Sequence, residues 1–102
     1  MSYVFPPAPV TSEASSIGQT SFIANWSASQ GATAYTLDVS SSDAFASFVT
    51  GFENRNVGNV ITYAVTGLSA GTTYYLRVRA LNASGSSENS DIRSLVTSPP
   101  NP

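Results

Sequence analysis

The chain has 102 residues, with six acidic and four basic side chains and a formal net charge of −2. All four basic residues are arginines, and histidine, cysteine and lysine are absent. These absences exclude a histidine-activated serine or cysteine nucleophile, a Schiff-base lysine, a zinc site of the Cys/His kind and any disulfide bond. We therefore expect one non-catalytic domain that binds no metal and no cofactor.

Proline-rich segments lie near both ends of the chain. Residues 6–9 and 99–102 contain three prolines each, and proline favours extended backbone and disfavours strand pairing. We predict a domain at residues 8–98, with an N-terminal linker at residues 1–7 and a C-terminal linker at residues 99–102. Linkers of this kind indicate a unit of a longer multidomain chain.

Between these ends, short runs of β-branched and aromatic residues alternate with clusters of Gly, Ser and Asn, and no segment has a helical apolar period. This pattern is typical of an all-β domain. It predicts strands, in chain order, at residues 9–14, 21–26, 34–40, 48–52, 60–65, 74–81 and 91–97. The segments at 27–32, 54–59 and 82–87 are expected to be loops or polar breaks.

Two of these strands alternate clearly between two faces. In the third strand Tyr35, Leu37 and Val39 share one face, opposite Thr36 and Asp38. In the sixth, Tyr74, Leu76 and Val78 share a face, opposite Tyr75, Arg77 and Arg79. The register of the last strand stays open. Alternation puts Leu95 on one face of the strand and both Ile92 and Val96 on the other, so either face could be the buried one. Seven antiparallel strands with one apolar face each predict a sandwich of two sheets.

Residues 68–80 read Leu-Ser-Ala-Gly-Thr-Thr-Tyr-Tyr-Leu-Arg-Val-Arg-Ala. This segment resembles the E–F turn and F strand of fibronectin type III domains, whose pattern is roughly Gly-Leu-x-Pro-Gly-Thr-x-Tyr-x-Val-Arg-Val-x-Ala. Ala70 stands where the family commonly has proline, so the turn loses one φ restraint but keeps Gly71. The resemblance covers about residues 8–98 and implies a seven-stranded antiparallel immunoglobulin-like β-sandwich.

The resemblance also implies roles for core residues. Tyr74 would be the tyrosine corner, with its hydroxyl bonded to the backbone near residues 68–70, and Trp26 would fill the space between the sheets. The expected core consists of Val10, Phe22, Ala24, Trp26, Tyr35, Leu37, Val39, Val65, Leu68, Tyr74, Leu76 and Val78.

The charge balance limits the partners. Four arginines among six carboxylates do not supply the basic face that nucleic acids or anionic membranes need. No apolar run approaches the roughly 20 residues of a membrane span, and residues 1–6 do not read as a secretory signal. We expect a monomer, because an acidic surface and terminal prolines discourage pairing between sheet edges.

The outward residues Tyr75, Arg77 and Arg79 allow two interpretations. They are either cross-strand packing on a solvated sheet, with Asp38 as the charge partner, or a face that binds a protein or polysaccharide. The aromatic residues Phe45, Phe48 and Phe52 are interpreted as core or edge packing.

The Ser/Thr/Asn-rich, lysine-free composition is similar to that of type III modules in secreted bacterial multidomain proteins. That likeness implies an extracellular, non-catalytic spacer whose partners are the neighbouring domains of its parent chain. The alternative is an adhesion module that binds a protein or carbohydrate through loops 27–33 and 82–87 or through the Tyr75, Arg77 and Arg79 face.

Overall fold

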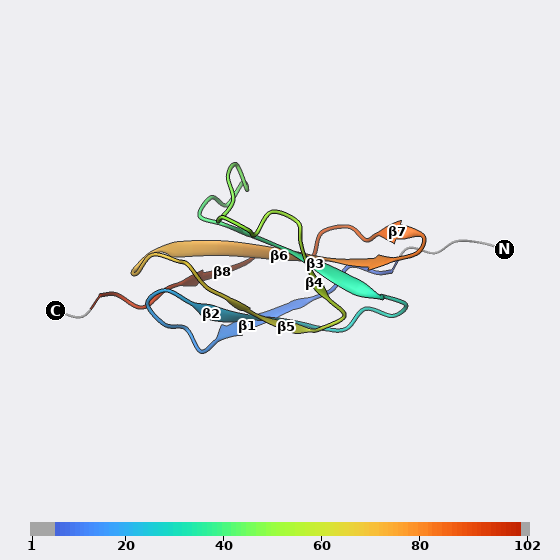
Figure 1. The fold of residues 1–102 in the computed structure, drawn as a ribbon, viewed down its shortest axis with the longest axis horizontal. Coiled ribbons are helices and arrows are strands. Elements are labelled where there is room, and N and C mark those ends of the chain that lie inside the picture. Colours follow the sequence, from blue (N-terminus) through green and yellow to red (C-terminus); the bar gives the residue numbers. More distant parts are fainter. Residues whose placement is uncertain (1–5, 101–102) are drawn as a thin grey trace.

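A computed structural model describes residues 6–100, which form eight strands and no helix. The linker residues 1–5 and 101–102 lie outside the described residues. Two antiparallel sheets pack face to face (Figure 1), which confirms the all-β sandwich. The strands are β1 (Thr11–Ser15), β2 (Phe22–Trp26), β3 (Ala34–Ser40), β4 (Arg55–Gly58), β5 (Thr62–Val65), β6 (Thr73–Asn82), β7 (Gly85–Ser86) and β8 (Arg93–Val96).

One sheet has three strands in the order β1-β2-β5. The other has five, in the order β4-β3-β6-β7, with β8 paired to β6. The strand count is eight rather than seven, because a two-residue strand, β7, forms within the predicted loop at 82–87 and pairs with the end of β6.

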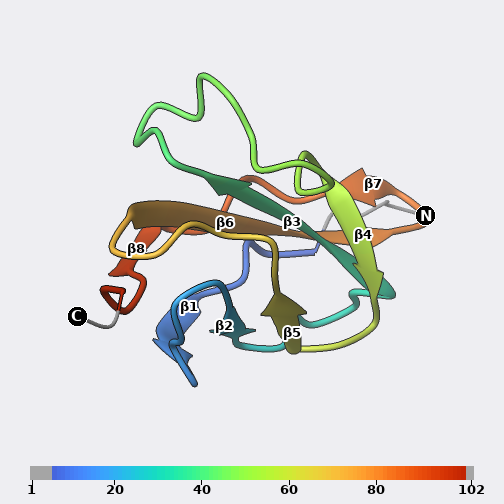
Figure 2. The ribbon, with the colours of Figure 1, turned by 60° about the vertical axis from the view of Figure 1, so that its left-hand side comes forward.

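The fourth predicted strand is wrong in position. Residues 48–52 form turns, in which Gly51 has a φ of 87° and the Phe52 amide bonds back to the Val49 carbonyl. The real fourth strand, β4, lies in the segment predicted to be a polar break and pairs with β3. Much of the segment between β3 and β4 stands out from the sandwich on the outer side of β3 (Figure 2), although Phe52 near its end packs into the core. The backbone of residues 48–52 bonds to β3 at Val39 alone, whose amide donates to the Phe52 carbonyl and whose carbonyl accepts from the Val49 amide. These two bonds do not make a regular strand, and the apolar side chains of the segment serve packing.

The core lies between the two sheets, as strand alternation predicts. Eleven of the twelve expected core residues are buried, with exposed fractions of 0–6%: Phe22, Ala24, Trp26, Tyr35, Leu37, Val39, Val65, Leu68, Tyr74, Leu76 and Val78. The rings of Trp26 and Tyr35 meet with their centroids 5.9 Å apart. The Tyr74 hydroxyl accepts a hydrogen bond of 2.8 Å from the Ser69 amide, which confirms the tyrosine corner.

Val10 is a correction to the predicted core, because 63% of it is exposed. The inward position at the start of β1 belongs to Thr11, which is buried and pairs with Trp26. The first inward-facing residue of β1 is therefore Thr11, one position later than predicted. Thr11 tolerates burial because the Asp91 carboxylate accepts bonds from its hydroxyl and amide.

The register of the last strand is settled by its pairing with β6. Leu95 pairs with Tyr74 and points into the core. Ile92 and Val96 are 50% and 57% exposed, so they lie on the opposite face.

Candidate functional site

The three residues interpreted either as cross-strand packing or as a binding face lie on the outer side of β6. Their register places Tyr75 opposite Ser40, Arg77 opposite Asp38 and Arg79 opposite Thr36. All three predicted residues are partly buried. We call Tyr75, Arg77 and Arg79 the β6 face.

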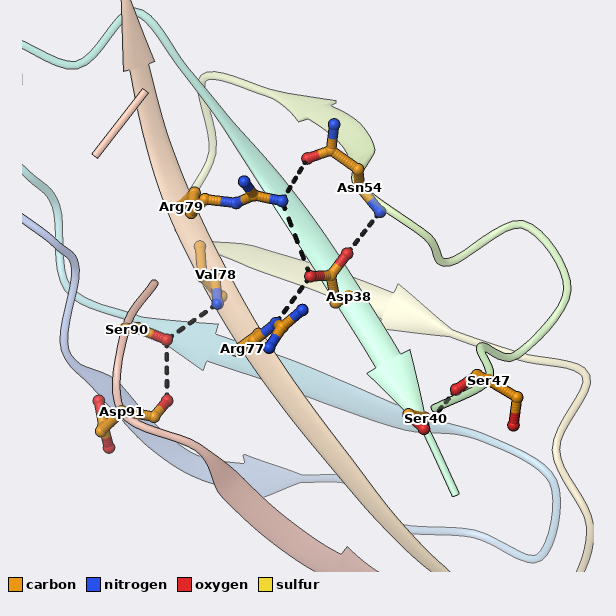
Figure 3. Close-up of polar contacts among 9 residues, drawn as sticks. All are labelled: Asp38, Ser40, Ser47, Asn54, Arg77, Val78, Arg79, Ser90 and Asp91. Atoms are coloured by element: carbon orange, nitrogen blue, oxygen red, sulfur yellow. Dashed lines mark hydrogen bonds and ion pairs between the residues drawn. The ribbon is translucent and has the colours of Figure 1, made fainter. Parts of the chain in front are cut away.

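Asp38 is the centre of the polar contacts on this face (Figure 3). Its carboxylate accepts a hydrogen bond of 2.9 Å from Arg77 Nε and lies 3.9 Å from Arg79 Nη2. The Asn54 amide also donates to it, and the Asn54 side-chain oxygen accepts a 3.1 Å bond from Arg79. Asp38 is therefore the charge partner of both arginines, which agrees with the interpretation of this face as cross-strand packing.

The face is not the solvated surface that strand alternation predicted. Asp38 is 3% exposed and Thr36 is 6% exposed, while the side chains of Arg77 and Arg79 keep 24% and 31%. An outward position on a strand becomes buried when another segment covers it, and here residues 41–54 do so. Period-two alternation carries no information about such a cover.

Phe45 is the main covering side chain. Its buried ring lies 4.1 Å from the Arg77 guanidinium carbon, a cation–π distance. The Phe48 ring packs beside it at 6.3 Å, and the Ser40 hydroxyl bonds to the Ser47 carbonyl at the base of the loop. Phe45 has a φ of 53°, which is uncommon for a bulky residue. Phe45 and the half-buried Phe48 therefore pack on the outer face, whereas Phe52 joins the core.

What remains accessible on this face is its β8 side. Tyr75 pairs with Ser94, and the exposed Ile92 and Val96 lie before and after Ser94 on the same chain segment. Arg77 and Arg79 each form a hydrogen bond with another side chain, whereas Tyr75 forms none within residues 6–100.

Sequence reasoning did not find a second aromatic–arginine cluster at the other edge of β3. Arg55 of β4 donates from Nε to the Tyr63 hydroxyl at 3.2 Å, and its guanidinium lies 5.4 Å from the Phe52 centroid and 5.7 Å from that of Tyr63. Because β4 and β5 belong to different sheets, this cluster links the sheets at their edge. No sequence signal marks it, since Arg55 sits in a run of polar residues.

Sequence reasoning also missed the contact between Thr11 and Asp91. The carboxylate accepts bonds from the Thr11 amide at 3.0 Å and hydroxyl at 2.7 Å, and Arg93 Nη2 donates to the Thr11 carbonyl at 2.9 Å. Burial raises the pKa of Asp91, but the two bonds from Thr11 and the nearby Arg93 charge outweigh it, so this pKa lies below the usual aspartate value.

Among the described residues, no three Asp or Glu side chains gather closely enough to hold a metal ion together. They also contain no helix long and apolar enough to cross a membrane. A shallow cavity of about 220 Å³ lies between β1 and β8 and is lined by Glu13, Ala14, Ile17, Arg93, Ser94 and Leu95.

Comparison with known proteins agrees with this geometry. The family model of the fibronectin type III domain matches residues 6–96. A Kelch domain-containing protein of Saccharolobus solfataricus is 36% identical over 103 aligned positions, which cover 100% of this chain but 13% of that protein.

Solved structures give the same fold. The sixth fibronectin type III domain of human fibronectin type III domain containing protein 3 is 24% identical, with a TM-score of 0.77 over 100% of this chain and 93% of that one. Another domain of a human protein of that name is 22% identical, with a TM-score of 0.72 over 98% and 93%. The family match, together with the two-sheet topology and the tyrosine corner, shows that the chain belongs to the fibronectin type III domain family.

Proposed function

We propose that this fibronectin type III domain is a non-catalytic spacer that sets the distance and orientation of neighbouring domains in a larger extracellular protein. The observation that carries the proposal is the position of the two chain ends. The described chain begins and finishes at opposite ends of the long axis of the sandwich (Figure 1). A domain so built adds its own length to any chain in which it is placed.

Both ends are anchored to the domain, which supports an orienting role. Pro6 and Pro9 are buried, and the Pro7 carbonyl accepts a hydrogen bond from the Ser29 hydroxyl. Residues 6 and 7, expected to be linker, therefore pack on the domain. At the other end the Gly71 amide bonds to the Ser98 carbonyl at 2.9 Å.

The proline linker beyond Ser98 starts against the same turn. Pro99 and Pro100 run close to Gly71. A Cβ atom added to Gly71 would lie 3.7 Å from the Pro99 Cα and 3.8 Å from the Pro100 Cδ, which is ordinary van der Waals contact. Proline-rich chain is semi-rigid, so a linker that begins in contact with the domain transmits the direction of the domain to the next one.

A larger parent protein fits the relative from Saccharolobus solfataricus, of which this chain spans 13%. The extracellular location rests on the similarity of the composition to modules of secreted bacterial proteins. No partner beyond the neighbouring domains is needed for this role.

The test is a tandem of two copies of the 102-residue chain with one fluorophore on each copy. Single-molecule energy transfer should give one narrow, long distance. Replacing Pro99 and Pro100 with glycine should broaden the distribution, because glycine-rich linkers behave as flexible coils. An equally broad distribution before and after the replacement would overturn the orienting role.

A second candidate is a binding module, and the observation that favours it is the accessible side of the β6 face. Tyr75 lies beside the exposed Ile92 and Val96, and tyrosine and apolar side chains are typical anchors of interfaces. Against it, Arg77 and Arg79 already contact Asp38. Binding on a glycan array or to a protein that is abolished by Tyr75→Ala, while thermal stability is kept, would favour this candidate over the spacer.

A further inference from the structure

The turn between β6 and β7 carries an acceptor pattern for N-linked glycans. Residues 82–84 read Asn-Ala-Ser, and Asn-x-Ser or Asn-x-Thr, with any middle residue except proline, is the triplet to which an oligosaccharide is attached. A second triplet, Asn-Trp-Ser, occupies residues 25–27. The sequence alone does not rank the two triplets, but the fold places them in opposite environments.

The triplet at 25–27 is built into the three-stranded sheet. Asn25 pairs with Ser12 of β1 on one side and with Thr62 of β5 on the other. The middle residue, Trp26, is 3% exposed and belongs to the core. An enzyme that must take three consecutive residues into its active site cannot do so here without opening the sheet. The folded domain therefore withholds this triplet.

The triplet at 82–84 forms the tip of a hairpin instead. Asn82 pairs with Gly85, so Ala83, which is exposed, and Ser84 are the two residues of the turn. Asn82 Oδ1 accepts hydrogen bonds from the Ser84 amide at 2.8 Å and from the Gly85 amide at 3.2 Å, which is an Asx turn. This turn holds the Asn82 carboxamide beside Ser84, so the two residues that define the triplet lie together at the tip.

The hairpin is held firmly at its base. The Leu81 carbonyl accepts bonds from the Thr33 amide at 2.7 Å and from the Thr33 hydroxyl at 3.2 Å. On the returning side, the Ser87 amide donates to the Ala80 carbonyl at 2.7 Å, and the Ser87 hydroxyl accepts from the Ala80 amide at 2.9 Å. The tip stands at the end of the long axis where the described chain begins (Figure 1). An oligosaccharide attached there would extend from the end of the sandwich without displacing a core side chain.

We propose that Asn82 is an acceptor of an N-linked oligosaccharide in the folded domain. The donor is an oligosaccharide joined to a lipid through a diphosphate, and a transferase catalyses the step. Asn82 Nδ2 forms a bond to the anomeric carbon of the first sugar, and the bond from that carbon to the diphosphate oxygen breaks. The lipid diphosphate leaves with the electron pair, and the proton lost from Nδ2 passes to a base of the transferase. The proposal rests on the proposed extracellular location only for the meeting of this chain with such an enzyme.

The test incubates the purified, folded 102-residue chain with an oligosaccharyltransferase specific for Asn-x-Ser/Thr triplets and with a lipid-linked oligosaccharide. Intact-mass spectrometry should show the addition of one oligosaccharide, and peptide mapping should place it on Asn82. Asn82→Gln and Ser84→Ala should each remove the addition. Ser84→Ala keeps the backbone amide that donates to Asn82, so its effect isolates the hydroxyl from the turn. Ser84→Thr keeps the hydroxyl and should keep the addition.

The matched control is Ser27→Ala, which removes the triplet at 25–27 and should leave the addition unchanged. Near-UV circular dichroism checks that each variant is folded. Addition at Asn25 of the folded chain, or no addition at all, would overturn the proposal. Because the enzyme is supplied in vitro, neither result depends on where the chain resides. If Asn82 is modified in vitro while the chain recovered from its own cells lacks the oligosaccharide, the extracellular part of the spacer function fails and the acceptor site stands.

Discussion

The space between the sheets and the outer face of β3 and β6 bury side chains by different physical means. Between the sheets, apolar side chains such as Trp26 and Leu76 are covered because every second residue of a strand points toward the facing sheet. On the outer face, Asp38 is covered because it pairs with Arg77 and because residues 41–54 fold over it. The first kind of burial follows from local alternation, whereas the second depends on contacts between segments distant in sequence.

The comparison predicts the largest effect for the space between the sheets. Trp26→Ala should lower the free energy of unfolding by about 3–5 kcal/mol, because it opens a cavity in a close-packed core. Urea denaturation measures this change. Trp26→Phe is the matched control and should cost less, about 1.5 kcal/mol, since it fills most of the volume and removes an indole N–H that has no partner among the described residues. Equal losses for both variants would contradict cavity formation as the cause.

On the outer face, Asp38→Asn should cost about 2 kcal/mol, because it removes the charge that Arg77 and Arg79 share. The cost is below that of a fully buried pair since both arginines keep contact with water. Asp43→Asn, in the loop and exposed, should change the stability by less than about 0.5 kcal/mol. If the two variants behaved alike in urea denaturation, the outer face would be a solvated surface after all.

The tyrosine corner tests one polar bond at the margin of the core. Tyr74→Phe deletes the hydroxyl that the Ser69 amide contacts and should cost about 1–1.5 kcal/mol. Tyr75→Phe is the neighbouring control on the outer face and should be close to neutral. Thermal melting of both variants measures the difference, and an unchanged melting temperature for Tyr74→Phe would count against the corner.

Phe45 sharpens the comparison because its ring stabilises the loop while its backbone is strained. Phe45→Ala loses the contact with Arg77 and keeps the positive φ of 53°. Phe45→Gly loses the same contact but relieves the backbone, so it should be more stable than Phe45→Ala by about 1 kcal/mol. Chemical denaturation of the pair decides the point, and the reverse order would show that the positive φ carries no strain.

The smallest effect concerns the contact of Thr11 with Asp91 and depends on pH. The pKa of Asp91 is lower in the folded state than in the unfolded chain, where an aspartate titrates near 3.9. The contact therefore stabilises the fold above about pH 4, and this stabilisation is lost as the pH falls through the lowered folded-state pKa. The stability difference between the parent chain and Asp91→Asn should be largest at neutral pH and shrink in acid. A difference independent of pH would contradict the linkage.

The sequence allowed a partial prediction of the candidate site. Alternation in 74–81 placed Tyr75, Arg77 and Arg79 together on the outer side of β6, and one interpretation made Asp38 their charge partner. Only the structure shows that Asp38 lies opposite Arg77. It could not show that Phe45 covers Arg77, because loop 41–54 has no period that relates it to β6. The Arg55 cluster and the Thr11 contact were missed for the same reason, since each joins residues from separate strands through geometry alone.

By itself the sequence determined the all-β class, the inward residues of the central strands and the family. These follow from local rules, namely the period of two in strands and the compact motif around Tyr74. Only the tertiary structure decided the position of β4, the orientation of Val10 and Leu95, and the burial of Asp38. The physical reason is that edges, ends and outer faces are fixed by what packs against them, and those partners are separated by up to 82 residues along the chain.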